Sequence, residues 1–300
     1  MPDYDVVVIG SINHDLTVVT ERHPDPGKTV LGTEHHSGPG GKGANQAVAA
    51  ARLESRVAMI GRVGDDEQGR ALVEALESER VDVAGVVRDA TAGTGLAVIT
   101  VDRDGENTIV VIPGANRFVD AGQMRASAAI ISEAPVVLAQ LEIPVEAVSE
   151  AAAMVGGTFL LNPAPAQALS PDLLERVDVL MPNRGELVML AGDEEPDDPS
   201  DVIGAARTVE GPGAVVVTLG AEGAVLVEGR EAAHIPSPEV EVVDTTGAGD
   251  AFCGAVAHAL AMGIALAEAV RWGVAAGAIA TTRRGAQTAL PTLRELKAFL

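Results

Sequence analysis

Cysteine, lysine and aromatic residues are scarce in this chain of 300 residues. Its single cysteine, Cys253, excludes an intramolecular disulfide, and such cysteine usage does not suggest an oxidising compartment. No apolar run approaches the roughly 20 residues that span a bilayer, and the opening MPDYDVVVIG lacks the basic start of a secretion signal. We therefore expect a cytoplasmic protein without a membrane partner.

Basic residues are also few. The 43 acidic residues face 21 basic ones, of which three are lysines, so the net charge is -22. This field repels nucleic acid, which excludes nucleic acid as an expected partner. The acidity could form a surface for a basic partner, or carboxylates could coat the whole surface, as in proteins that stay soluble in concentrated salt. Because lysine is depleted throughout, the second, halophilic interpretation is favoured.

Apolar residues, by contrast, make up 47% of the chain, and short β-branched runs alternate with alanine-rich helical stretches. Runs such as DVVVIG and AVVVTLG are apolar almost throughout, which is typical of strands buried on both faces of a mainly parallel sheet. The pattern predicts a doubly wound α/β fold with helices on both faces, in a single domain over residues 1–300. Residues 17–37 and 95–114 break the alternation, the second with a hairpin pattern, and should form a small β-sheet lid.

A glycine-rich turn stands out in residues 242–252, VVDTTGAGDAF. We interpret it as the link between a strand ending at Val243 and a long alanine-rich helix. Free N–H groups at a helix start attract anions, and glycine lets a phosphate approach the backbone closely. Asp250 stands near the expected helix start, where aspartate is an ordinary N-cap, but it could also take a proton from a hydroxyl that attacks a γ-phosphate. The motif alone does not choose between these roles.

Eight other segments accompany this motif: SINHD (11–15), GPGGKGANQAVAAARL (38–53), GRVGDD (61–66), QLEIP (140–144), LNPAPA (161–166), MPNRGE (181–186), VTLGAEG (217–223) and TRRGAQTALP (282–291). With all nine in this order over nearly the full length, the chain resembles the sugar kinases of the ribokinase (PfkB) family. The resemblance implies a phosphotransferase that uses ATP and Mg²⁺ to phosphorylate a sugar hydroxyl, on a doubly wound fold with a small lid. Residues 38–43 also match G-x-G-x-x-G, but no buried strand precedes them, so a dinucleotide site is not expected.

The resemblance also implies roles for individual residues. Asp250 would be the catalytic base, and the amides of Gly247, Ala248 and Gly249 would form an anion hole. The sugar-binding residues would be Ser11, Asn13, Asp15, Gly40, Gly41, Lys42, Gly43, Asn45, Glu142 and Asp250. Considered without the family, Asn13 and Asp15 are also ordinary turn formers, and the glycines suit a turn before a helix.

Nucleotide and cation sites follow from the same resemblance. The nucleotide would contact Asn183, Thr218, Gly220, Gly223 and Gly249, and Glu186 would help to hold Mg²⁺ through water. A monovalent cation, expected to be K⁺, would be bound by Asp244, Thr246, Ala280, Arg283 and Gly285. Relatives often place a serine ligand at the position of Ala289, so dependence on potassium stays open. Val274 replaces a residue that is polar in many relatives, which predicts apolar contacts to adenine.

The N-x-D opening and GGKGANQ favour D-ribose as the acceptor, with D-ribose 5-phosphate as the product. The shared motifs leave open a nucleoside, ribose 1-phosphate, deoxyribose or a keto-sugar acid. A non-catalytic sugar sensor is the alternative of another class, and it is disfavoured because a sensor needs no proton acceptor beside an anion hole. Apolar alternation in the lid stretches predicts a homodimer in which two lids pair.

Overall fold

The computed structural model describes residues 3–103, 106–192, 196 and 198–300. Its strands are β1 (Val6–Ile9), β2 (Asn13–Thr20), β3 (Gly32–Gly40), β4 (Val57–Gly64), β5 (Val81–Asp89), β6 (Gly95–Val101), β7 (Asn107–Ile112), β8 (Val136–Ala139), β9 (Thr158–Leu161), β10 (Val179–Leu180), β11 (Ala214–Thr218), β12 (Ala224–Glu228) and β13 (Glu231–Ile235). They form a nine-stranded sheet in the order β13-β12-β11-β10-β9-β8-β1-β4-β5 and a four-stranded sheet in the order β3-β2-β6-β7.

The helices are α1 (Lys42–Arg52), α2 (Glu67–Ser78), α3 (Ala121–Ala126), α4 (Ala128–Glu133), α5 (Val145–Ala152), α6 (Pro171–Leu174), α7 (Arg184–Ala191), α8 (Pro199–Ala206), α9 (Ala248–Ala261), α10 (Leu266–Ala280) and α11 (Leu293–Phe299), with 3-10 turns η1 (Gly114–Phe118), η2 (Gly220–Glu222) and η3 (Gln287–Ala289). Within the described ranges, no helix combines the length and the apolar character needed to cross a membrane.

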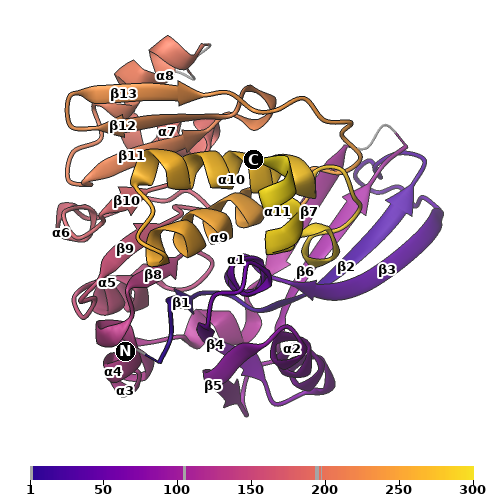
Figure 1. Cartoon of the computed structure of the whole chain (residues 1–300). Coiled ribbons are helices and arrows are strands. Elements are labelled where there is room, and N and C mark those ends of the chain that lie inside the picture. Colours follow the sequence, from indigo (N-terminus) through magenta and orange to yellow (C-terminus); the bar gives the residue numbers. More distant parts are fainter. Residues whose placement is uncertain (1–2, 104–105, 193–195, 197) are drawn as a thin grey trace.

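Helices cover both faces of the large sheet, and the adjacent strands β1 and β8 are accordingly apolar and buried at every position. In β1, Val6 and Val8 pack in a core with α1, α9 and α10. The alternate residues, Val7 and Ile9, pack in a second core with α3, α4 and α5. Figure 1 shows α1, α9, α10 and α11 gathered on one side of the sheet. The predicted α/β fold with helices on both faces is confirmed.

The strand order reverses at β1, which pairs in parallel with both β4 and β8. From β1 the chain builds outward through β4 and β5, and it later returns to build in the other direction from β8 through β11. In open sheets of this kind, ligands bind beyond the carboxyl ends of the strands at the point of reversal. The segments after β1 and β8 begin with Gly10 and Gln140, so SINHD and QLEIP meet at this edge.

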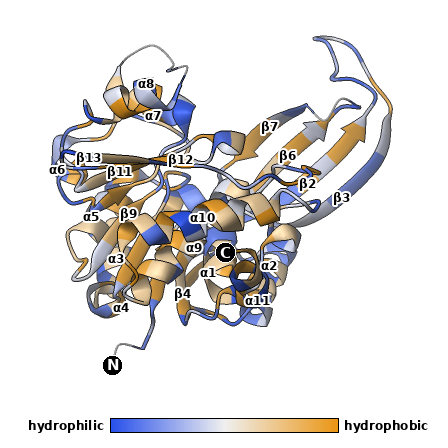
Figure 2. Cartoon of the chain, turned by 45° about the horizontal axis from the view of Figure 1, so that its top comes forward, coloured by the Kyte–Doolittle hydropathy of each residue, from blue (hydrophilic) through white to orange (hydrophobic). Residues whose placement is uncertain are grey.

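The small sheet extends to one side of the body (Figure 2). Its strand β2 pairs antiparallel with β3 and parallel with β6, and β7 completes it as an edge strand antiparallel to β6. The predicted hairpin in residues 95–114 is therefore present, although residues 104–105 of its expected turn lie outside the described residues. Since β2 begins at Asn13 and β3 ends at Gly40, the sheet includes three predicted sugar-binding residues, Asn13, Asp15 and Gly40.

The prediction that a strand ends at Val243 is wrong. Val242 and Val243 lie in a non-strand segment between β13 and α9, and they are 58% and 52% exposed. The backbone N–H of Val243 donates to the carbonyl of Thr281, 2.8 Å away, at the end of α10. The chain leaves the sheet at Ile235 and must cross to α10, so these valines follow that path and do not pair in the sheet.

Candidate active site

The glycine turn leads directly into α9, as predicted, but the helix begins earlier than expected. Gly247 is the N-cap with φ +78°, and Asp250 is the third residue of the helix, so the prediction that it occupies an N-cap position is wrong. A side chain at Gly247 would be strained at this φ and would lie 3.0 Å from the Cα of Ala286. The amide of Ala248 donates to the carbonyl of Thr245. Among the described residues, the amides of Gly247 and Gly249 make no backbone hydrogen bond, so these two can receive an anion.

The carboxylate of Asp250 is buried against α1. One oxygen accepts from Asn45 Nδ2 at 2.9 Å, and the other accepts from Gln46 Nε2 at 3.0 Å. Burial raises the pKa of Asp250, while the charge of Lys42 and the two amide donors oppose that rise. A buried carboxylate with a raised pKa and fixed donors is a stronger proton acceptor than an exposed one, which suits a general base.

Beside Asp250, the loop after β1, the start of α1 and the segment after β8 share one carboxylate. Glu142 Oε2 accepts from Ser11 Oγ at 2.5 Å and from the backbone amide of Lys42 at 3.1 Å. The Nζ atom of Lys42 lies 3.9 Å from Oε1 of the same glutamate. Burial alone would lower the pKa of Lys42, but Asp250, Glu142 and Glu186 outweigh it and raise the pKa. Lys42 therefore remains a cation among three carboxylates.

Asp15 pairs with Gly38 across β2 and β3, and its carboxylate lies over Gly40, two residues further along β3. A Cβ at Gly40 would come within 2.0 Å of Asp15 Oδ2, so only glycine fits there. Oδ1 of Asp15 is buried and has no hydrogen-bond partner among the described residues. Burial, with the nearby charges of Glu142 and Asp250, raises the pKa of Asp15 to about 7. A buried acceptor without a donor is costly, and a hydroxyl of a ligand would satisfy it.

A cleft of about 560 Å³ opens on the other side of the α9 start. It is lined by Thr218 at the end of β11, by Gly220 and Gly223 from the β11–β12 connection and by Ala248 and Gly249 from α9. Phe252 and Val274 contribute apolar walls, and Val274 is the residue predicted to make apolar contacts to adenine. The structure therefore brings four predicted nucleotide-binding residues together at one cleft: Thr218, Gly220, Gly223 and Gly249.

Asn183 and Glu186 begin α7 as a reciprocal capping box. Asn183 Oδ1 accepts from the amide of Glu186, and Glu186 Oε2 accepts from the amide of Asn183, both at 2.8 Å. Neither residue lines the cleft, although Asn183 is bridged to Thr218, which does. Burial raises the pKa of Glu186, against the Asn183 amide and Lys42. Within the described ranges no three His, Cys, Asp or Glu side chains gather as a metal site; a single carboxylate fits Mg²⁺, which keeps most of its waters.

The predicted monovalent-cation residues lie around Asp244. Its two oxygens accept from the amides of Thr246 at 2.9 Å and Gly285 at 2.8 Å, which join the segment before α9 to the loop after α10. Burial would raise the pKa of Asp244, but these bonds hold it below its usual value. The remaining predicted ligands, Ala280 and Arg283, are linked by an amide-to-carbonyl bond of 3.4 Å. An ionised carboxylate beside backbone carbonyls at a helix end is a donor set that suits K⁺.

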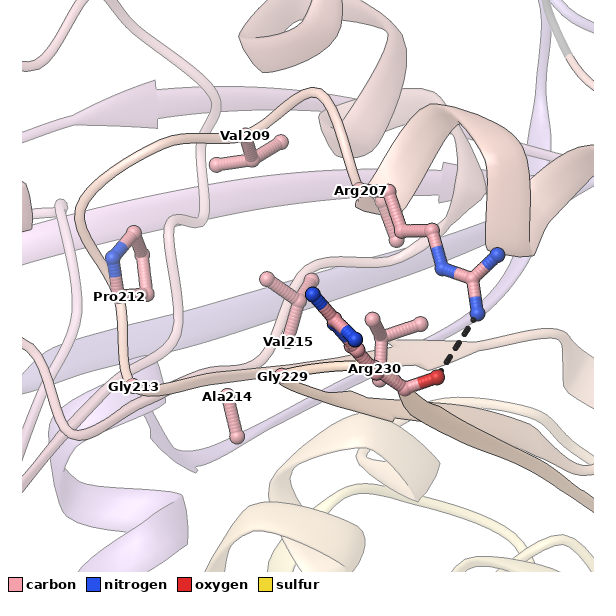
Figure 3. A pocket seen from close by; sticks show the side chains of 10 residues that line it. Arg207, Val209, Pro212, Gly213, Ala214, Val215, Gly229 and Arg230 are labelled. Carbon is pink, nitrogen blue, oxygen red and sulfur yellow. Dashed lines mark hydrogen bonds between the residues drawn. The ribbon is translucent and has the colours of Figure 1, made fainter.

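A second hollow, of about 570 Å³, lies away from all these residues. Figure 3 shows it between the end of α8 and the β12–β13 turn, where Arg207 Nη2 donates to the carbonyl of Arg230 at 3.2 Å. It includes Ala214, the first residue of β11, and therefore lies at the opposite end of that strand from Thr218. No predicted site residue lines it.

Several buried amides at the site were not predicted to act there. Gln46, Gln140 and Gln287 all lie within quoted motifs, so a signal was present, but no role was assigned to them. No sequence motif included Asn116 in η1, yet its Nδ2 donates to Asn13 Oδ1 at 2.7 Å and fixes that side chain. These residues orient other polar groups and lie far from them in the sequence, which is why local pattern did not find them.

The chain matches the family described as pfkB family carbohydrate kinase over residues 3–293. A ribokinase of Haemophilus influenzae is 39% identical over 299 residues, covering 98% of both chains. A deoxyribokinase of Salmonella typhi is 35% identical over 303 residues, covering 99% of this chain and 98% of its own.

Solved structures give the same result. The ribokinase of Thermotoga maritima superposes with a TM-score of 0.90 at 37% identity, covering 98% of each chain. The ribokinase of Arabidopsis thaliana, complexed with ribose and ATP, also gives 0.90, at 31% identity, covering 100% of this chain and 99% of its own.

Proposed function

The chain belongs to the pfkB family of carbohydrate kinases, and on that premise we propose that it transfers the γ-phosphoryl group of ATP to D-ribose, forming D-ribose 5-phosphate. One observation carries the proposal. The buried carboxylate of Asp250 and the unpaired amides of Gly247 and Gly249 meet at the start of α9, between the polar cluster after β1 and the 560 Å³ cleft. The group that would accept the proton and the groups that would stabilise the phosphoryl charge thus lie together.

In the proposed reaction, the hydroxyl oxygen of the sugar attacks the γ-phosphorus while the bond from phosphorus to the ADP oxygen breaks. The proton of that hydroxyl passes to Asp250. The free N–H groups of Gly247 and Gly249 donate to oxygens of the transferred group as charge develops on them, aided by the positive end of α9.

Sugar recognition is proposed to depend on acceptors that no protein group satisfies. Asp15 Oδ1 has no donor among the described residues, so a sugar hydroxyl can supply one. Asn13 is held by Asn116 through its oxygen, which leaves its amide nitrogen to donate. Lys42 and Glu142 complete a polar wall on the far side. Vicinal hydroxyls, which both donate and accept, match such a mixed set.

The nucleotide is proposed to lie in the cleft bounded by Thr218, Gly220 and Gly223, with adenine against Phe252 and Val274. Asn183 and Glu186, fixed by their capping box, would hold Mg²⁺ through water; when bound, the ion neutralises charge between the β- and γ-phosphates. Asp244, Thr246, Ala280, Arg283 and Gly285 would hold K⁺ beside the anion hole. Since Ala289 has no side-chain oxygen and is fully buried, that cation would depend on backbone carbonyls and Asp244.

A panel of acceptors tests the proposal. ADP release is followed with Mg-ATP and D-ribose, 2-deoxyribose, a nucleoside, ribose 1-phosphate or a keto-sugar acid, in sodium or potassium buffer. We expect D-ribose to give the highest kcat/KM and potassium to raise it. A preference for 2-deoxyribose would instead align the chain with its deoxyribokinase relatives. Tight sugar binding without ADP release from any acceptor would identify a sensor and overturn the kinase.

We further propose that two copies pair through the small sheet. Its edge strand β7 is exposed along its whole length, and the apolar residues Ile109, Val110, Val111 and Ile112 are each 43% to 64% exposed. An open edge with an apolar row is a common interaction surface. Sedimentation velocity should give a dimer at micromolar concentration and a monomer for Val110→Lys. A monomeric parent chain at that concentration would contradict the proposal.

A further inference from the structure

Asp250 is held by a symmetric pair of amides whose orientation matters. Asn45 and Gln46 are consecutive residues of α1, and each donates an N–H to a different oxygen of the Asp250 carboxylate. A carboxamide donates only through nitrogen and accepts only through oxygen. If either amide turned over, its oxygen would face the carboxylate, and attraction would become repulsion. Something must therefore keep both nitrogens directed at Asp250.

Two further glutamines do this from opposite sides. Gln140, which follows β8, donates through Nε2 to Gln46 Oε1 at 2.6 Å. Gln287, in η3, donates through Nε2 to Asn45 Oδ1 at 3.1 Å. Both glutamines are buried. In each case the donor occupies the oxygen end of the amide, and the nitrogen end faces Asp250. Gln46 Nε2 also donates to Asn162 Oδ1 at 3.1 Å, so Asn162 helps to hold that amide, whereas among the described residues Gln287 alone is bonded to the oxygen of Asn45.

The two glutamines are themselves anchored. Arg52, at the end of α1, donates through Nη1 to the backbone carbonyls of Gln287 at 2.6 Å and Leu290 at 3.1 Å, and its guanidinium pairs with Glu79. Gln140 lies against the backbone of Gly10, where an added Cβ would come within 2.0 Å of its Oε1. The Arg52 bonds fix the backbone that carries Gln287, and Gly10 leaves the space that the Gln140 side chain occupies.

We propose that Gln140 and Gln287 are positioning residues, each directing one amide N–H at one oxygen of Asp250 and so holding the carboxylate ionised and in a fixed orientation. The inference rests on the proposed role of Asp250 as the base. Neither glutamine hydrogen-bonds to Asp250, so each acts through its partner amide. The loop that carries Gln287 also carries Gly285, whose amide donates to Asp244. Through Gln287 and Asn45, this loop is therefore hydrogen-bonded to the base.

The test uses substitutions that keep size and change hydrogen bonding. Gln287→Met removes the donor, and Gln287→Glu replaces it with an acceptor that favours the reversed Asn45 amide. Loss of an N–H bond to an ionised carboxylate raises its pKa, so the acid limb of the kcat–pH profile should move upward, on the order of one pH unit. Below that limb, kcat should fall about tenfold, with the KM for ATP unchanged. Gln287→Glu should have the larger effect, and Gln68→Glu, the same change at an exposed position of α2, should have none.

A double-substitution cycle separates positioning from general stability. In an Asn45→Ala background, Gln287→Met should change the pH profile little further, because the amide it orients is gone. Gln140→Met makes the measurement through Gln46 and serves if the Gln287 variants fail to fold, as judged by ATP binding; its shift should be smaller, because Asn162 also holds the nitrogen of Gln46. The inference is overturned if the acid limb stays in place in the folded variants, or if the Asn45 and Gln287 effects multiply independently. A fully active Asp250→Asn enzyme would instead refute the base assignment itself.

Discussion

Replacing Asp15 with asparagine should stabilise the protein above neutral pH and impair sugar binding. The buried Oδ1 has no donor among the described residues, so ionising this carboxyl inside the fold is unfavourable. An asparagine has the same shape and cannot ionise. It escapes that cost but loses the charged acceptor that a sugar hydroxyl would use.

The magnitude follows from the pKa of Asp15, which burial raises from 3.8 to about 7. Between pH 5 and pH 7 the unfolded chain has this carboxyl ionised while the folded chain keeps it protonated. Folding then loses about 1.4 kcal/mol per pH unit as the pH rises, until the folded group also ionises. Across this window, the stability of Asp15→Asn relative to the parent should increase by about 3 kcal/mol, and it should level off above pH 7.

Urea unfolding of both proteins at pH 5, 6, 7 and 8 measures this difference, and other titrating groups cancel because they are common to both. Asp65→Asn, at an exposed position, is the matched control and should show no such trend. The KM for D-ribose should rise about 10-fold or more, since a hydrogen bond to a charged group is worth about 1.5–3 kcal/mol. A stability difference that does not change with pH would refute the reasoning about Asp15.

Four further outcomes are expected. Asp250→Asn should lower kcat by roughly 10²- to 10⁴-fold while ATP binding, measured by calorimetry, persists; near-normal turnover would contradict the base. Gly247→Ala should lower kcat at least about tenfold, because residue 247 has φ +78° and the new Cβ would lie 3.0 Å from the backbone of Ala286. As a control, Gly229→Ala should leave turnover unchanged, because Gly229 also has a positive φ but lies in open space. Burial lowers the pKa of His258 from 6.5 to about 4, so the contribution of this residue to stability should fall by about 3 kcal/mol as pH drops through that window. In urea titrations, the stability of His258→Leu relative to the parent should rise by that amount over the same window. Finally, with a net charge of -22, the unfolding temperature should rise with NaCl between 0.1 and about 2 M; a flat response would argue against salt adaptation.

Much of the fold was predictable because its signals are local. Apolar runs such as DVVVIG are buried on both faces in the structure, as expected for a parallel sheet. The Val242–Val243 run misled because β-branched residues favour strands on average, while the chain there had to leave the sheet and reach α10. The start of α9 also differs from the predicted start. Gly247 at a positive φ lets the helix begin directly after the turn, with no capping side chain.

At the site, the sequence by itself determined which chemical groups are available: the glycine turn, Asp250, and the motifs that supply Asn13, Asp15 and Glu142. Local order along the chain is sufficient for that, since each motif occupies a few consecutive residues. Only the tertiary structure decided which amides direct their N–H groups at Asp250. Gln287 reaches Asn45 across 242 positions of the sequence and Asn45 reaches Asp250 across 205, and contacts at such separations exist only once the helices have packed on the sheet.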